Sequence, residues 1–134
     1  MKLRFSPCED GFDLHFADRL VLAHRHDRPA LTIARGNSSV AMQRGNFRID
    51  DAPSAELSPQ EWHKEGDTIV LLDRGEPAVR LELGESALTT VCLRGGYDRI
   101  WLRWHAAPGE TVWGGGEQLS YLALNGRAFP MWTS

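Results

Sequence analysis

Apolar and polar residues alternate along most of this chain, in runs that are each only a few residues long. The run FDLHF at residues 12–16 has the period of two that is typical of a strand with one buried face. No segment keeps a helical period for three turns. Similar apolar runs occupy residues 20–23, 31–33, 40–42, 47–49, 68–72, 79–83 and 88–93. The pattern predicts an all-β fold, an antiparallel β-sandwich.

Glycine, proline, aspartate and asparagine separate these runs at intervals of about 8 to 12 residues, as in sandwich domains. The chain has 134 residues, which predicts one domain spanning residues 1–134. Residues 50–65 are rich in alanine, proline, serine and charge, so we predict a surface loop there. Ser58 could cap one short helical turn, because Glu61 lies three residues on.

Charge and hydropathy exclude several classes of protein. The net charge is -3 and no run of lysine and arginine forms a patch, so we expect no nucleic-acid partner. The N-terminus lacks the apolar core of a signal peptide, and no apolar stretch is long enough to span a bilayer. We therefore expect a soluble, cytoplasmic protein with no membrane partner. Cys8 and Cys92 lack C-x-x-C spacing, which predicts reduced thiols, at least one of them buried.

The histidines do not form a metal site in sequence. His24 and His26 share one face of a strand, a spacing that metal sites use, but a third ligand is missing. His15, His63 and His105 have no local partner and no serine or cysteine arranged as a triad. We expect His24 and His26 to be exposed strand residues, and we expect neither a metal nor another cofactor.

Four tryptophans lie in the last third of the chain. Trp101 and Trp104 fall on opposite faces of the strand expected at residues 100–105. We predict that one of them fills the sandwich and that the other covers an interface with a neighbouring domain, while a sugar-stacking role for one stays open. For Trp113 and Trp132, the wall of a pocket and ordinary packing are equally supported.

A run of three glycines, residues 114–116, indicates backbone that turns sharply or allows a close approach. Glu117 and Gln118 follow at once, and an adjacent carboxylate and carboxamide suit the recognition of sugar hydroxyls. A phosphate-binding loop is disfavoured, since the run lacks the lysine and the spaced third glycine. A glycine-rich hairpin with both polar side chains in water is the remaining alternative.

The C-terminal quarter resembles the N-terminal domain of family 31 glycoside hydrolases, the retaining α-glucosidase family. The residues that match its motif are Gly114, Gly116, Glu117, Leu124, Gly126, Phe129 and Trp132. Many α-glucosidases carry arginine after the glutamate. Gln118, the ending FPMWTS and the upstream run RGNFRI at residues 44–49 are instead similar to the sulfoquinovosidase branch.

The resemblance implies a galactose mutarotase-like sandwich whose partners are an α-glycoside substrate and a downstream (β/α)₈ barrel. Retaining hydrolysis needs two carboxylates about 5 to 5.5 Å apart, and the family holds both in that barrel. We therefore expect no catalytic residue in this chain. We expect the chain to be the N-terminal part of a longer enzyme, so that the sandwich can be incomplete at its C-terminus. Glu117, and with it Gln118, would bind the leaving group at the pocket rim. In the sulfoquinovosidase branch the sugar would carry a sulfonate.

A free-standing module that binds carbohydrate or protein is the alternative. Such a module hides its apolar faces, whereas part of a larger enzyme leaves an unpaired edge strand and exposed aromatic residues near Trp101 or Trp104.

Overall fold

The computed structural model describes residues 2–111, and every regular element in that range is a strand. The predicted all-β class is confirmed, and each strand pairing is antiparallel. The strands are β1 (Leu3–Cys8), β2 (Gly11–Phe16), β3 (Arg19–Arg25), β4 (Leu31–Gln43), β5 (Asn46–Leu57), β6 (Glu61–Glu65), β7 (Thr68–Asp73), β8 (Glu76–Leu83), β9 (Leu88–Cys92) and β10 (Arg99–Leu102).

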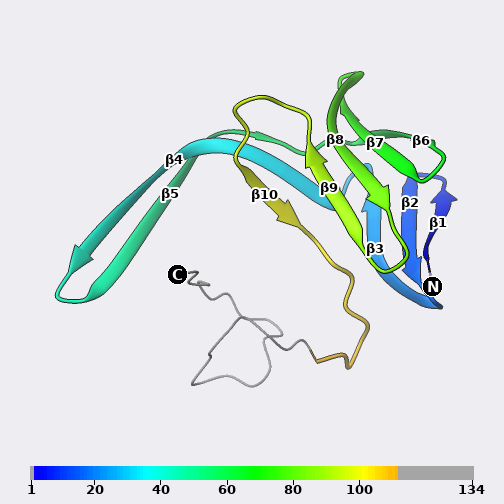
Figure 1. Cartoon of the computed structure of the whole chain (residues 1–134), viewed down its shortest axis with the longest axis horizontal. Coiled ribbons are helices and arrows are strands. Elements are labelled where there is room, and N and C mark those ends of the chain that lie inside the picture. Colours follow the sequence, from blue (N-terminus) through cyan, green and yellow to red (C-terminus); the bar gives the residue numbers. More distant parts are fainter. Residues whose placement is uncertain (1, 112–134) are drawn as a thin grey trace.

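The strands form three sheets, with the orders β1-β2-β3, β6-β7-β8-β9 and β10-β4-β5. The first two sheets are built from consecutive hairpins and lie beside each other at one end of the molecule (Figure 1). In the third sheet, β10 returns from far along the chain to pair with the start of β4, so that Trp101 is opposite Thr32. The three sheets together are the body of the molecule, apart from the outer part of the β4–β5 hairpin.

One apolar core joins the three sheets. Its members are nearly inaccessible to solvent and come from alternate positions of the strands, as the sequence pattern predicts. The core comprises Leu3, Phe12, Leu14, Leu22, Ala30, Leu31, Ile33, Ile69, Leu71, Ala78, Val79, Leu81 and Leu83.

An aromatic cluster closes one side of this core. Trp62 is half-buried and meets the rings of Phe5 and Phe12 edge-on, with centroid distances of 5.3 and 5.4 Å. His24 stacks on the other side of Phe12, with ring centroids 4.9 Å apart and planes 14° apart. The cluster ties β1, β2 and β3 to β6.

His24 corrects the expectation of two exposed histidines, because its side chain is fully buried while His26 is exposed. Its Nε2 bonds the Gln60 carbonyl at 3.2 Å, and its Nδ1 accepts from the Ala30 amide at 3.4 Å. This pattern defines a neutral ring with the proton on Nε2. Burial lowers the pKa of His24, and the bond to Gln60 opposes that effect.

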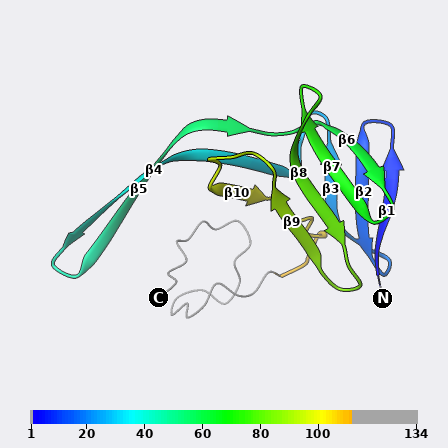
Figure 2. The same cartoon turned by 45° about the horizontal axis from the view of Figure 1, so that its top comes forward.

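The β4–β5 hairpin extends well beyond the other strands, and residues 37–52 of it are here called the arm (Figures 1 and 2). Arg44 and Gly45 form its tip, with φ of 51° and 80°, as a two-residue hairpin turn with two left-handed positions requires. A bulge between Arg35 and Gly36 marks where the arm leaves the body. A Cβ on Gly36 would lie 2.4 Å from the Ala52 carbonyl oxygen, so only glycine fits there.

The strand boundaries differ from the sequence prediction in three places. The runs at 31–33 and 40–42 belong to one long strand, because the polar residues between them lie on the exposed arm. The surface loop predicted at residues 50–65 is wrong, since β5 and β6 cover most of it. The short helical turn at Ser58 is also absent from the described residues, where 58–60 connect β5 to β6.

Two further expectations about single residues are wrong. Cys8 and Cys92 are free thiols, as predicted, but both are exposed instead of one being buried. Neither Trp101 nor Trp104 fills the core, since they are 40% and 58% exposed. Trp62 is the tryptophan that packs against the core. The sequence analysis did not anticipate this, because it predicted a surface loop at residues 50–65.

Candidate functional site

The predicted substrate-binding residues Glu117 and Gln118 lie outside the described residues, as do Trp113 and Trp132. Their roles stay predictions. The structure does describe the segment that leads toward them, residues 103–111, and the sheet face from which that segment departs.

Backbone hydrogen bonds hold this segment against the body. The Arg103 amide donates to the Ala30 carbonyl at 2.8 Å, and the His105 amide donates to the Val21 carbonyl at 2.9 Å. Further on, the Glu110 carboxylate accepts from the Ala107 amide at 2.8 Å and pairs with Arg19. The path of the chain is therefore fixed on the body up to a few residues before the glycine run.

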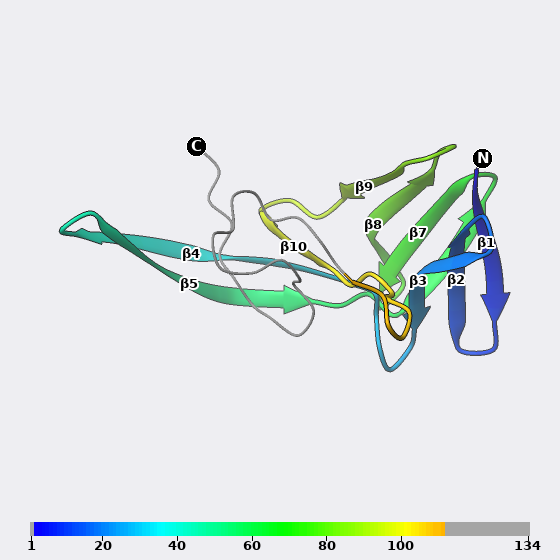
Figure 3. The same ribbon diagram turned by 90° about the horizontal axis from the view of Figure 1, so that it is seen from below.

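The register of the third sheet aligns polar and aromatic side chains on one face. Trp101 of β10 is opposite Thr32 of β4, and Ala34, two residues further along β4, is opposite Glu56 of β5. Residues two apart share a face of a strand, so these side chains all project to the same side. Figure 3 shows β10 lying along β4 at this place.

A pocket of about 330 Å³ opens on this face, lined by Thr32, Glu56, Ser58, Trp101 and Arg103. The Thr32 and Ser58 hydroxyls are hydrogen-bonded to each other at 2.7 Å. Arg103 Nη1 donates to the Pro29 carbonyl at 2.9 Å and to the Thr32 hydroxyl at 3.4 Å, which orients the guanidinium. Five polar or aromatic side chains thus line one open pocket, here called the polar pocket.

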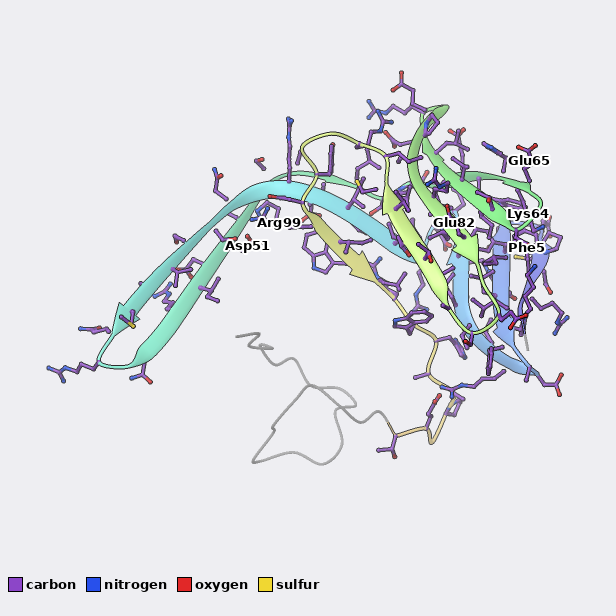
Figure 4. The ribbon with its side chains drawn as sticks, viewed as in Figure 1. Phe5, Asp51, Lys64, Glu65, Glu82 and Arg99 are labelled. Atoms are coloured by element: carbon purple, nitrogen blue, oxygen red, sulfur yellow. The ribbon has the colours of Figure 1, made fainter. Side chains whose placement is uncertain are left out.

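The same face continues to a charged network at the base of the arm. Arg99 donates to the Asp51 carboxylate through Nε at 2.8 Å and Nη2 at 2.6 Å. It also donates to the Ser38 hydroxyl at 2.9 Å and the Gly36 carbonyl at 3.1 Å, and it pairs with Asp98. Figure 4 shows Arg99 and Asp51 where the arm meets the body. One half-buried guanidinium therefore joins β10 to both strands of the arm.

These contacts fix the ionisation of the network. Hydrogen bonds from Arg99 and then from Ser38 lower the pKa of Asp51 to about 2. The two aspartates in turn raise the pKa of Arg99. The pair stays charged over the whole physiological pH range.

A second, apolar groove lies on the other side of the 103–111 segment. It encloses about 230 Å³ and includes Leu3, Phe16, Val21, Leu88 and Trp104 in its lining. Phe16 in this lining is 38% accessible to solvent, and elsewhere on the body Leu93 is 40% and Ile100 51% accessible. An exposed aromatic patch near Trp104 is what the sequence predicts for part of a larger enzyme.

Within residues 2–111, no group of three or more histidine, cysteine, aspartate or glutamate side chains is arranged to hold a metal ion. None of the described residues forms a helix able to cross a membrane.

Comparison with known proteins gives consistent matches, although no family model matches the chain. A sulfoquinovosidase of Agrobacterium fabrum (strain C58 / ATCC 33970) is 37% identical over 134 residues, covering 98% of this chain and 20% of that protein. A sulfoquinovosidase of Escherichia coli (strain K12) is 35% identical over 152 residues, covering 100% of this chain and 21% of that protein.

A solved structure is similar to this chain as well. It is a GH31 family sulfoquinovosidase from E. rectale in complex with the aza-sugar inhibitor IFGSQ, with a TM-score of 0.76 and 27% identity over 97% of this chain and 20% of that one. The chain thus spans about a fifth of the relatives it matches.

These matches confirm the predicted resemblance: the chain is a homologue of the N-terminal region of glycoside hydrolases of family 31. Each of the three proteins described above is a sulfoquinovosidase.

Proposed function

We propose that this chain is the non-catalytic N-terminal domain of a retaining α-glycosidase whose substrates are α-glucoside-type sugars, specifically sulfoquinovosides. The observation that carries the proposal is the similarity to three sulfoquinovosidases along nearly the whole chain. Because the catalytic carboxylates of the family lie in a barrel downstream of this domain, the chemistry belongs to that barrel and this chain contributes binding contacts and a docking face.

The apolar groove supports the docking role over that of a free-standing module. Trp104 is 58% exposed and Ile100 51% exposed, and both are large apolar side chains that a self-contained domain covers. β10 also leaves one edge unpaired among the described strands. We assign the groove and this edge to contact with the catalytic barrel.

The rim role falls to Glu117, assisted by Gln118. The glycine run would bring this carboxylate to the lip of the barrel's pocket, where it accepts hydrogen bonds from hydroxyls of the leaving group. Support for this role comes from the described segment that precedes the run, which Arg103 and His105 anchor on the body.

The complete gene product carrying Glu117→Gln tests this role. We expect kcat/KM to fall about tenfold for a glyceryl sulfoquinovoside, since one hydrogen bond to a charged group is lost. For an aryl sulfoquinovoside, whose leaving group offers no hydroxyl, we expect little change. Equal losses on both substrates would contradict a leaving-group role.

A further inference from the structure

The polar pocket contains a carboxylate and a guanidinium that do not pair with each other. The Glu56 side chain takes part in no ion pair or hydrogen bond with another described residue, and the Arg103 side chain makes none with a carboxylate in that part of the chain. Both nevertheless line the same pocket of about 330 Å³. Among the described residues, the pocket therefore presents a strong acceptor and a strong donor that are not paired with each other.

The sheet geometry sets the size of this opening. Glu56 and Trp101 are on the outer strands of β10-β4-β5, with one strand between them. Neighbouring strands are about 4.8 Å apart, and Glu56 is displaced from Trp101 by two residues along the strands, so the two side chains originate about 12 Å from each other. That separation accommodates a single six-membered sugar ring.

The remaining lining suits the two faces of such a ring. Trp101 is 40% exposed, so part of its indole is open to stack on the apolar C–H face of a pyranose. Thr32 and Ser58 hold their hydroxyls on the floor of the pocket, where each can take part in one more hydrogen bond. The pocket thus combines an indole ring, two hydroxyls that are hydrogen-bonded to each other, and two side chains of opposite charge. This combination suits the binding of a neutral polyol.

Charge argues against small ions of a single sign. An anion would lie against the Glu56 carboxylate, and a cation would lie against the Arg103 guanidinium. A neutral sugar satisfies both groups, since one hydroxyl donates to the carboxylate and a neighbouring oxygen accepts from the guanidinium.

We propose that the polar pocket of β10-β4-β5 is a binding site for a neutral pyranose, with Trp101 as the stacking surface and Glu56 and Arg103 as the groups that recognise its hydroxyls. The proposal does not depend on the proposed function, because every residue in it belongs to the described part of the chain.

The test is saturation-transfer difference NMR on the complete gene product, with methyl α-D-glucopyranoside and methyl β-D-galactopyranoside as probes. We expect transfer to the ring C–H protons of at least one probe. Trp101→Ala and Glu56→Gln should each weaken binding about tenfold, since each removes one main contact. The matched control Glu65→Gln, on exposed β6, should bind as the parent protein does.

Other outcomes overturn the proposal. They are the absence of transfer to either probe, transfer that Trp101→Ala and Glu56→Gln leave unchanged, or Trp101-dependent binding of methanesulfonate in place of the neutral sugars. Melting curves check the fold of each variant, and Trp101→Phe, which keeps a smaller stacking ring, replaces Trp101→Ala if the latter unfolds. Sulfoquinovoside hydrolysis assayed on the same samples reports separately on the proposed function.

Discussion

The body and the arm are made of the same kind of alternating sequence, yet their apolar side chains have opposite surroundings. In the body, Phe12 and Ile33 are wholly inaccessible to solvent. In the arm, Val40 is 64%, Met42 68% and Ile49 52% exposed. Alternation therefore predicts a strand and its apolar face, but it does not predict what covers that face.

The arm and the body are also stabilised by different kinds of contact. Two-stranded ribbons are marginally stable in water by themselves, so the arm needs support where it leaves the body. The Arg99 network provides that support through polar contacts, whereas the body relies on burial. The two regions should therefore respond differently to truncation, to charge removal and to pH.

The largest effect should come from the body. Phe12→Ala removes a fully buried ring that contacts Phe5, Trp62 and His24. We expect a loss of about 3–5 kcal/mol in the free energy of unfolding, measured by urea titration. A loss below about 1 kcal/mol would mean that this core does not determine stability.

The next effect should be confined to the arm. Arg99→Ala removes the bonds to Asp51, Ser38 and Gly36, so we expect amide exchange across residues 37–52 to accelerate about tenfold while exchange in the body changes little. Arg48→Ala is the matched control, since that side chain is 78% exposed and, among the described residues, pairs with Asp50 two positions along the same strand. Similar acceleration in both variants would argue against a special role for Arg99.

As the pH falls, the body should lose stability at a higher pH than the arm network does. The folded-state pKa of His24 lies below its unfolded value, so the unfolded state binds more protons and stability falls as pH drops below about 6.5. The loss should reach at most about 1.4 kcal/mol per pH unit. The Asp51 pKa of about 2 places its own contribution lower: it is present above the unfolded value of 3.8 and is lost only as pH falls toward 2.

Urea titrations at pH 7.5 and 5.5 check this difference, with His24→Phe as the control. The variant should lose most of the pH dependence, because it has no ring nitrogen to protonate. A parent protein equally stable at both pH values would contradict a buried, neutral His24.

The smallest effect should come from the arm's apolar face. Val40→Thr changes an exposed side chain, so we expect less than about 0.5 kcal/mol in the unfolding of the 134-residue chain. A loss above about 1.5 kcal/mol would show that this face is covered in solution, and the contrast between the two regions would then disappear.

The sequence predicted many strands of the body, because the local alternation of apolar and polar residues determines the strands there. Alternation at residues 12–16, 79–83 and 88–93 placed β2, β8 and β9, and the tip of the arm followed from a glycine that tolerates a left-handed φ. β6 was not predicted, because Trp62 is its one large apolar residue and no alternation is visible. The length of β4 was not predicted, because a strand that is exposed on both faces has the polar composition of a loop.

The polar pocket was beyond sequence reasoning. Its residues are far apart along the chain, and only the pairing of β10 with β4 brings Trp101 to the same face as Glu56. The proposed rim site, in contrast, was identified from the sequence and not from the structure. Glu117 and Gln118 were identified from a motif and a family resemblance, and they remain predictions because they lie outside the described residues.

The most direct test of the central claim assays the complete gene product and the 134-residue chain side by side on an aryl α-sulfoquinovoside and an aryl α-glucoside. The account predicts that the complete protein hydrolyses the sulfoquinovoside with retention of configuration and prefers it over the glucoside. It predicts no detectable turnover by the chain, because the account assigns both catalytic carboxylates to the downstream barrel. Turnover by the purified chain, or none by the complete protein on either substrate, would contradict it.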